Sequence, residues 1–180
     1  MKNKTLWITQ TAIFIALLVV IHYMTAMLAN PLITGSAVNM TLIVSVMLCG
    51  LPSGLAVAAV SPAIARLIGI GPFWSLIPFI MAGNMTLVCI WHFVFKKAPA
   101  GKKANYVIAL ISAAILKFLV LYVGIVKIAV PLFLRLPENQ ANVISGMFSF
   151  SQIITASIGG VLAIAILPAL KKALGKYWIY

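Results

Sequence analysis

Acidic side chains are almost absent from this sequence. Glu138 is the one acid among 180 residues, against 13 lysines and arginines. Paired-carboxylate catalysis and carboxylate-based metal sites need several well-placed acids, and coupling of transport to protons or sodium normally uses acids within the membrane. The sequence has no residues for these mechanisms.

Other catalytic patterns are missing as well. The two cysteines, Cys49 and Cys89, each lie in an apolar run without the spaced partners of a zinc or redox motif, so we interpret them as small core residues. There is no Gly-Lys-Ser phosphate loop, which excludes ATP hydrolysis by this chain on motif grounds. Ser61, His22 and His92 remain for a serine or histidine mechanism, but their expected depths keep them apart. We therefore expect no enzyme, no metal and no cofactor.

Apolar residues dominate what is present. They make up 64% of the chain, charged residues 8%, and the mean hydropathy is +1.18. Soluble domains are about half apolar and about a quarter charged. An unusually apolar soluble bundle is the alternative, but so apolar a chain would lack the polar surface to stay dissolved as a monomer. We therefore predict an integral membrane protein whose apolar surplus faces the lipid bilayer.

The apolar runs predict an all-α chain, a single domain over residues 1–180 with six transmembrane helices. About 20 apolar residues cross a bilayer as a helix, and Pro, Gly or charge bounds six runs, at residues 7–28, 37–50, 55–68, 73–95, 106–130 and 143–170. The second and third are short, so they would tilt little, sit partly within the protein or borrow residues from the turns. The alternative of one long helix over residues 37–68 would enclose Pro52 and Gly54. Residues 135–142 are predicted to form the longest charged loop.

The net charge of +12 could indicate nucleic acid in a soluble protein, but here the lysines cluster at the ends of apolar runs, as membrane topology requires. With six spans and the N-terminus inside, nine of the thirteen cations lie on the cytoplasmic side: Lys2, Lys4, Lys96, Lys97, Lys102, Lys103, Lys171, Lys172 and Lys176. We expect both termini in the cytoplasm, a bacterial plasma-membrane location and no nucleic-acid partner. The run that follows Lys2 and Lys4 is too long for a cleavable signal peptide, so it is predicted to be retained as the first span.

Two lysines fall within the predicted fifth span. Lys117 lies near mid-depth, where an ionised side chain is costly and functional by default; the alternative is that it snorkels to cytoplasmic headgroups. Lys127, nearer the outer end, reaches either the outer interface or an outward-facing pocket. With no intramembrane acid to neutralise them, an anionic solute is a natural counter-charge, unless a lysine is neutral.

Polar and aromatic residues at middle or outer depth predict a solute site. Buried amides and imidazoles in a membrane need partners, and hydrogen bonds between helices are the simpler explanation for each one alone. Together they could line one cavity open to the outside, and such a site suits a small organic solute. Besides Lys117 and Lys127, the candidate binding residues are Asn39, Trp74, Asn84, Tyr122 and Gln152, with His22 and Asn142 nearby in the same group.

Several features together resemble the substrate-binding S component of an energy-coupling-factor (ECF) vitamin transporter. They are the length, six spans, basic ends, small residues Ala12 and Ala16 four apart in the first span, the turn at residues 50–54, and the segment from Ser61-Pro62 to Gly83-Asn84. In that family the S component captures a vitamin near the outer face and docks on a transmembrane scaffold subunit driven by two ATPases. The resemblance implies that Ala12 and Ala16 face the scaffold. It also implies a pocket formed by the loop after the first span and by spans four to six.

The substrate stays open, because no diagnostic residue set for riboflavin, thiamine, biotin or folate is present. The two lysines favour an anionic solute such as pantothenate or another carboxylate. The alternative functions are a structural, assembly or pore-forming membrane protein and, less favoured, an intramembrane enzyme acting on lipid.

Overall fold

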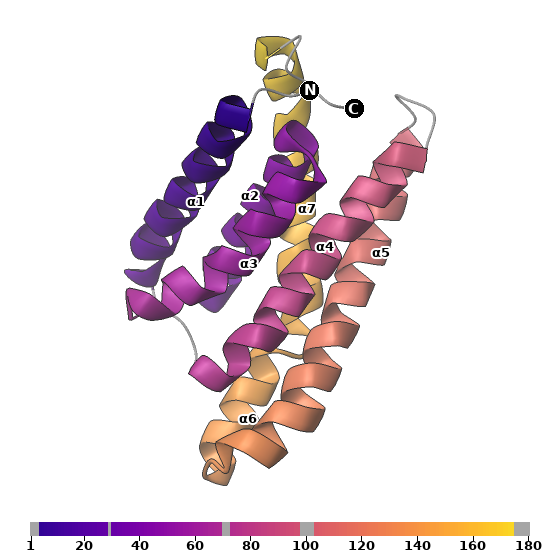
Figure 1. The fold of residues 1–180 in the computed structure, drawn as a ribbon. Coiled ribbons are helices and arrows are strands. Elements are labelled where there is room, and N and C mark those ends of the chain that lie inside the picture. Colours follow the sequence, from indigo (N-terminus) through magenta and orange to yellow (C-terminus); the bar gives the residue numbers. More distant parts are fainter. Residues whose placement is uncertain (1–3, 29, 70–72, 98–102, 175–180) are drawn as a thin grey trace.

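The computed structural model describes residues 4–28, 30–69, 73–97 and 103–174, and these residues are almost entirely helical, with no strand among them (Figure 1). The elements in chain order are α1 (Lys4–Ala26), α2 (Pro31–Cys49), α3 (Leu51–Leu67), the 3₁₀ turn η1 (Trp74–Leu76), α4 (Ile77–Lys97), α5 (Lys103–Leu121), the π-helix η2 (Tyr122–Leu134), α6 (Glu138–Met147) and α7 (Ser151–Leu174). The all-helical prediction is confirmed for the described residues.

Five helical segments are long and apolar enough to cross a membrane, and α3, with 17 residues, is a shorter apolar helix beside them. About 17 residues is the lower end of the range for a transmembrane helix. The described residues thus contain five to six apolar helices that fit a membrane bundle. The predicted cytoplasmic location of the termini stays a prediction.

The second and third helices lengthen by taking residues from the turns. At the start of α2, the Asn30 side chain accepts a hydrogen bond from the Leu32 backbone N–H at 3.0 Å, and Pro31 occupies the first turn, where its missing N–H costs nothing. Gly50 alone separates α2 from α3, with φ of 85° that favours glycine. The alternative of one long helix over residues 37–68 is therefore wrong, because the chain reverses at Gly50 and the two helices pack together.

The fifth predicted span was expected to end at Pro131, and this is wrong. The helix continues from α5 into η2 and passes Pro131 to end at Leu134. Proline disrupts an α-helix because its ring meets the carbonyl group four residues earlier. In the wider π-helix the hydrogen bonds run to the residue five positions earlier, which changes what lies opposite the ring.

The sixth predicted span is also wrong as a single helix, and most of the predicted loop over residues 135–142 is helical. The helix α6 begins at Glu138, whose carboxylate in the first turn complements the helix dipole. It ends at Met147, and α7 begins at Ser151. Two side chains bridge the break, because Ser151 Oγ donates to the Gly146 carbonyl at 3.0 Å and Gln152 Nε2 donates to the Met147 carbonyl at 2.9 Å.

The lysine-rich turns gather at one end of the bundle. The first turn of α1, the last of α4, the first of α5 and the last of α7 lie together at the top of Figure 1, whereas η2 and α6 lie at the opposite end. The sequence places Lys4, Lys96, Lys97, Lys103 and the pair Lys171-Lys172 in these turns. One end of the described bundle is thus basic, as the charge pattern predicted.

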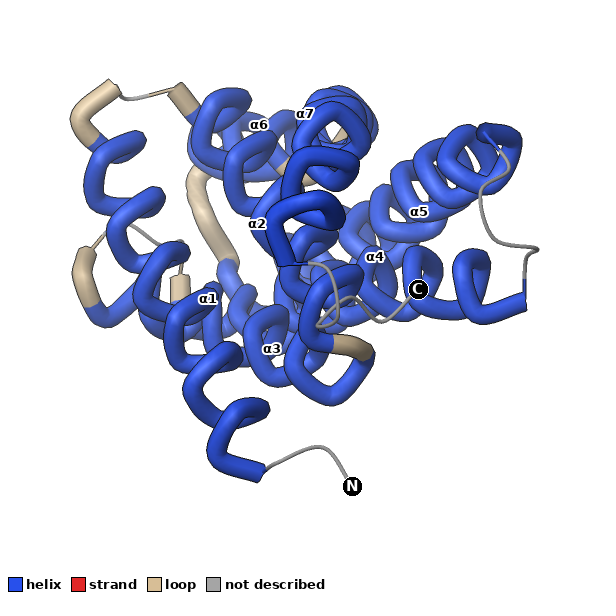
Figure 2. Tube along the Cα trace, turned by 90° about the horizontal axis from the view of Figure 1, so that it is seen from above, coloured by secondary structure: helices blue, strands red, loops and turns tan. Residues whose placement is uncertain are grey.

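Helix α2 is the centre of the packing. It contacts α1, α3, α4 and α7, and 67% of its span is buried, against 17% for α1 (Figure 2). Its closest neighbour is α7, where Gly159 lies against the α2 backbone: a Cβ on Gly159 would be 2.6 Å from the Ser36 carbonyl oxygen and 2.7 Å from Asn39 Cβ. Small residues permit such close approach of helices in a membrane. The α2–α7 contact thus depends on Gly159.

Replacing Gly159 with valine should therefore destabilise the bundle. The added carbons would force α2 and α7 apart, and overpacking of this kind typically costs about 1–3 kcal/mol. The apparent melting temperature of the purified chain in detergent measures the effect, and Gly146→Ala is the control, because a Cβ there meets nothing within 4 Å. Equal melting temperatures for Gly159→Val and wild type would contradict the close contact.

Candidate functional site

A cavity of about 900 Å³ lies among the helix ends away from the basic turns. All seven α-helices contribute to its wall, together with the segment between α1 and α2. Its lining is mostly apolar with a minority of polar groups, the usual make-up of a small-molecule site. The polar side chains in the lining are His22, Thr25, Asn30, Thr34, Asn39, Ser61, Asn84, Lys117, Ser151, Gln152 and Thr155.

Lys117 is the one charged residue among those that line the cavity, and it is 4% exposed. Its Nζ donates to Asn39 Oδ1 at 2.5 Å and to Asn84 Oδ1 at 2.8 Å. Three helices, α5, α2 and α4, thus meet at one amino group. The snorkelling alternative for Lys117 is wrong, because its amino group is held inside the bundle.

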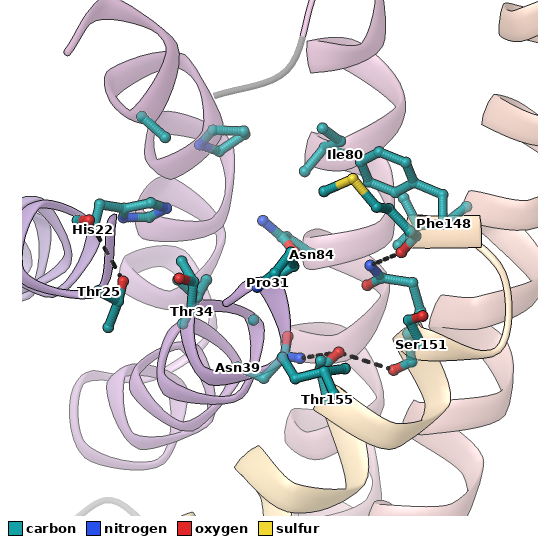
Figure 3. Close-up of a pocket in the computed structure, with 18 of the residues that line it drawn as sticks. His22, Thr25, Pro31, Thr34, Asn39, Ile80, Asn84, Phe148, Ser151 and Thr155 are labelled. Carbon is teal, nitrogen blue, oxygen red and sulfur yellow. Dashed lines mark hydrogen bonds between the residues drawn. The ribbon is translucent and has the colours of Figure 1, made fainter. Parts of the chain in front are cut away.

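A hydrogen-bonded chain continues from Lys117 to α7. Asn39 Nδ2 donates to Thr155 Oγ1 at 3.4 Å, and Thr155 Oγ1 donates to the Gln152 carbonyl at 3.3 Å (Figure 3). The close α2–α7 approach positions these groups, since a Cβ on Gly35 would be 2.9 Å from Thr155 Cγ2. Asn39 and Thr155 are 1% and 2% exposed, so neither can find solvent instead.

His22 enters the cavity from α1, on a different side from Asn39 and Asn84 (Figure 3). Its Nδ1 lies 2.8 Å from the Leu18 carbonyl oxygen. A carbonyl oxygen only accepts, so Nδ1 carries the proton in this bond. In the neutral ring, Nε2 is then an acceptor.

Four of the seven predicted binding residues meet at the cavity: Asn39, Asn84, Lys117 and Gln152. Three others, Trp74, Tyr122 and Lys127, are outside its lining. Trp74 is 54% exposed, and Lys127 is exposed with its Nζ 5.5 Å from the centre of the Tyr122 ring. Depth along a helix was the basis of these predictions, and depth does not tell which face of the helix points inward.

Most of the α6 contribution to the cavity was not predicted from the sequence. Val143, Gly146, Met147 and Phe148 line the cavity, although that stretch was predicted as the beginning of a long span. The cluster of Gly146 with serines at positions 145, 149 and 151 was an available signal for a helix break. Missed polar lining residues include Thr25, Thr34 and Thr155.

The docking residues predicted on α1 lie on its outer face. Ala12 and Ala16 are both exposed, among the large exposed side chains Ile13, Leu17 and Val20. The geometry leaves this apolar face open to lipid or to another helix.

The sequence model of the family described as "ECF transporter, substrate-specific component" matches residues 7–171. The chain belongs to this family. It is therefore a membrane substrate-binding subunit of an ECF transporter, which works with the ECF scaffold and ATPase modules on a small-molecule substrate. No curated protein and no solved structure matches the chain significantly.

The polar cluster makes a testable prediction about stability. Asn39→Leu removes one of two acceptors from the buried Lys117 amino group, which should cost about 1–3 kcal/mol. The double variant Asn39→Leu with Lys117→Met should be more stable than Asn39→Leu alone, because the buried amino group that lost its Asn39 acceptor is then removed as well. The melting temperatures of the wild type, Asn39→Leu, Lys117→Met and the double variant form a double-mutant cycle. Losses of stability that simply add would contradict the coupling between Asn39 and Lys117.

Proposed function

We propose that this subunit captures a vitamin-like organic molecule at the outer face of a bacterial plasma membrane and delivers it to an ATP-driven ECF importer. The single observation that carries the proposal is the cavity of about 900 Å³, which joins a mainly apolar wall to a small set of polar side chains. Sites for small organic molecules usually enclose about 300–1,000 Å³.

The orientation of the bundle is part of the proposal. Lysine-rich turns mark the cytoplasmic side of membrane proteins, and the cavity lies toward the other end of the described bundle. A solute would then enter from outside. We propose Asn39, Asn84, Lys117 and Gln152 as substrate-binding residues, to which His22, Thr34 and Thr155 are added from the geometry.

The energy source is proposed to lie in partner subunits. The chain has one acid and no phosphate-binding loop, so its own residues support neither ion coupling nor ATP hydrolysis. A scaffold subunit with two ATPases would supply the driving force, and the exposed α1 face with Ala12 and Ala16 is the proposed docking surface. Small residues four apart let a partner helix approach closely.

Filling the cavity should abolish capture. In Thr34→Trp the indole would occupy the cavity, whereas Ile33→Trp on the same turn of α2 adds the same group to a side chain that is 44% exposed and outside the lining. Thermal shifts of the purified chain with a panel of vitamins measure binding. We expect one compound to stabilise the wild type and Ile33→Trp but not Thr34→Trp. Absence of any stabilising compound would instead favour a structural or pore-forming subunit.

Blocking the α1 face should separate capture from transport. Ala12→Trp combined with Ala16→Trp should abolish uptake of the identified solute into cells that contain the ECF module, while binding to the purified chain stays unchanged. Ile111→Trp, on an exposed site of α5, is the matched control and should transport normally. Loss of binding along with uptake in the α1 variant would count against the assigned face.

A further inference from the structure

Each acceptor oxygen in the Lys117 cluster already accepts one hydrogen bond within the protein. The Oδ1 atoms of Asn39 and Asn84 accept from Lys117, and Thr155 Oγ1 accepts from Asn39 and donates to the Gln152 carbonyl. The cluster also retains donors that it can offer to the cavity. An ammonium group has three N–H bonds, of which two are used here.

The Asn84 side chain adds a second donor. Because Asn84 Oδ1 accepts from Lys117, the other end of this amide is the NH₂ group, and Nδ2 has no hydrogen-bond partner among the described residues. Asn84 is 4% exposed and lines the same cavity. A cation and an amide N–H facing one space form a site for an anion, since charge-assisted hydrogen bonds from nitrogen to carboxylate are among the stronger ones in proteins.

The described residues supply no anion to this site. The chain's only acidic side chain, Glu138, is exposed at the start of α6 and is outside the cavity lining. A buried charge without a partner is costly, whereas a bound anion would compensate it. The counter-charge would therefore come with the solute.

The α1 side of the cavity offers a hydrogen-bond acceptor. His22 holds its proton on Nδ1 toward the Leu18 carbonyl, so in the neutral ring Nε2 presents a lone pair, and the ring lies in the cavity wall. Helices α1 and α5 lie on opposite sides of the bundle in both views (Figures 1 and 2). An O–H or N–H group of a solute would be accepted there.

The geometry points to a specific substrate class: an organic monoanion, with a carboxylate held by Lys117 and Asn84 and a hydroxyl or amide N–H that donates to His22. This inference rests on the proposed function and narrows it. Neutral and cationic molecules would leave the ammonium without a counter-charge, so the same cavity would discriminate against them.

Matched acid and neutral probes test the inference on the full chain in lipid nanodiscs. The pairs are pantothenate with panthenol and biotin with its carboxamide, measured by titration calorimetry. Solute that the chain retains from a yeast extract is identified by mass spectrometry. We expect one acid, from a pair or from the extract, to bind about 10- to 100-fold more tightly than its neutral counterpart, the range of one charge-assisted hydrogen bond.

Variants identify the residues responsible for the preference for the acid. Lys117→Met should remove most of the preference for the acid, whereas Lys127→Met, the same change at a lysine outside the cavity, should keep it. His22→Leu should weaken binding and His22→Gln should restore much of it, because the glutamine oxygen can replace Nε2 as an acceptor. The comparison of acid with neutral probe uses the wild type, so it tests the substrate class even if Lys117→Met does not fold.

The remaining outcomes separate the two proposals. Tight binding of a neutral or cationic solute, unchanged in Lys117→Met, would overturn the substrate class and leave the proposed function standing. This result is expected if Lys117 is an uncharged amine whose two protons are both donated to the asparagines. If no probe and no component of the extract bound the wild type, the proposed function would fail and the substrate class with it.

Discussion

The buried amino group of Lys117 is the interaction on which the site depends. It lies within an apolar bundle, 4% exposed, and its Nζ is bonded to two asparagine oxygens rather than to a carboxylate. Burying a cation without an acidic partner is normally unfavourable. Asn39 and Asn84 satisfy two of its hydrogen bonds but do not neutralise its charge. The proposed anionic solute would supply the missing counter-charge.

The packing of α2 against α7 keeps this arrangement in place. Gly159 and Gly35 allow the two helices to approach until Asn39 reaches Thr155, and the chain of hydrogen bonds then runs from α5 through α2 to α7. In lipid, apolar surface alone does not drive helices together, so close contact and hydrogen bonds carry more of the association. The residues proposed to bind the substrate thus also hold the bundle together. In this proposal, substrate recognition and stability depend on the same side chains.

The break between α6 and α7 gives the cavity its remaining wall. Four residues from Val143 to Phe148 line it, and the side chains of Ser151 and Gln152 satisfy carbonyl groups at the end of α6. The break lets α6 pack against η2 while its residues line the cavity. Irregular backbone at membrane depth is tolerated where it lines a cavity within the protein. The departure from the predicted single span is therefore part of the site.

The sequence by itself determined that this chain is helical and apolar, that most of its lysines gather at one end, and that Lys117 needs an explanation. These conclusions rest on composition and spacing along the chain, which are properties of single segments. The resemblance noted from the sequence agrees with the family match. The tertiary structure alone decided that Lys117 points inward to Asn39 and Asn84 while Lys127, ten residues later, lies outside the cavity. Depth in a span follows from counting residues, but the direction of a side chain depends on helix rotation, which packing against neighbouring helices sets.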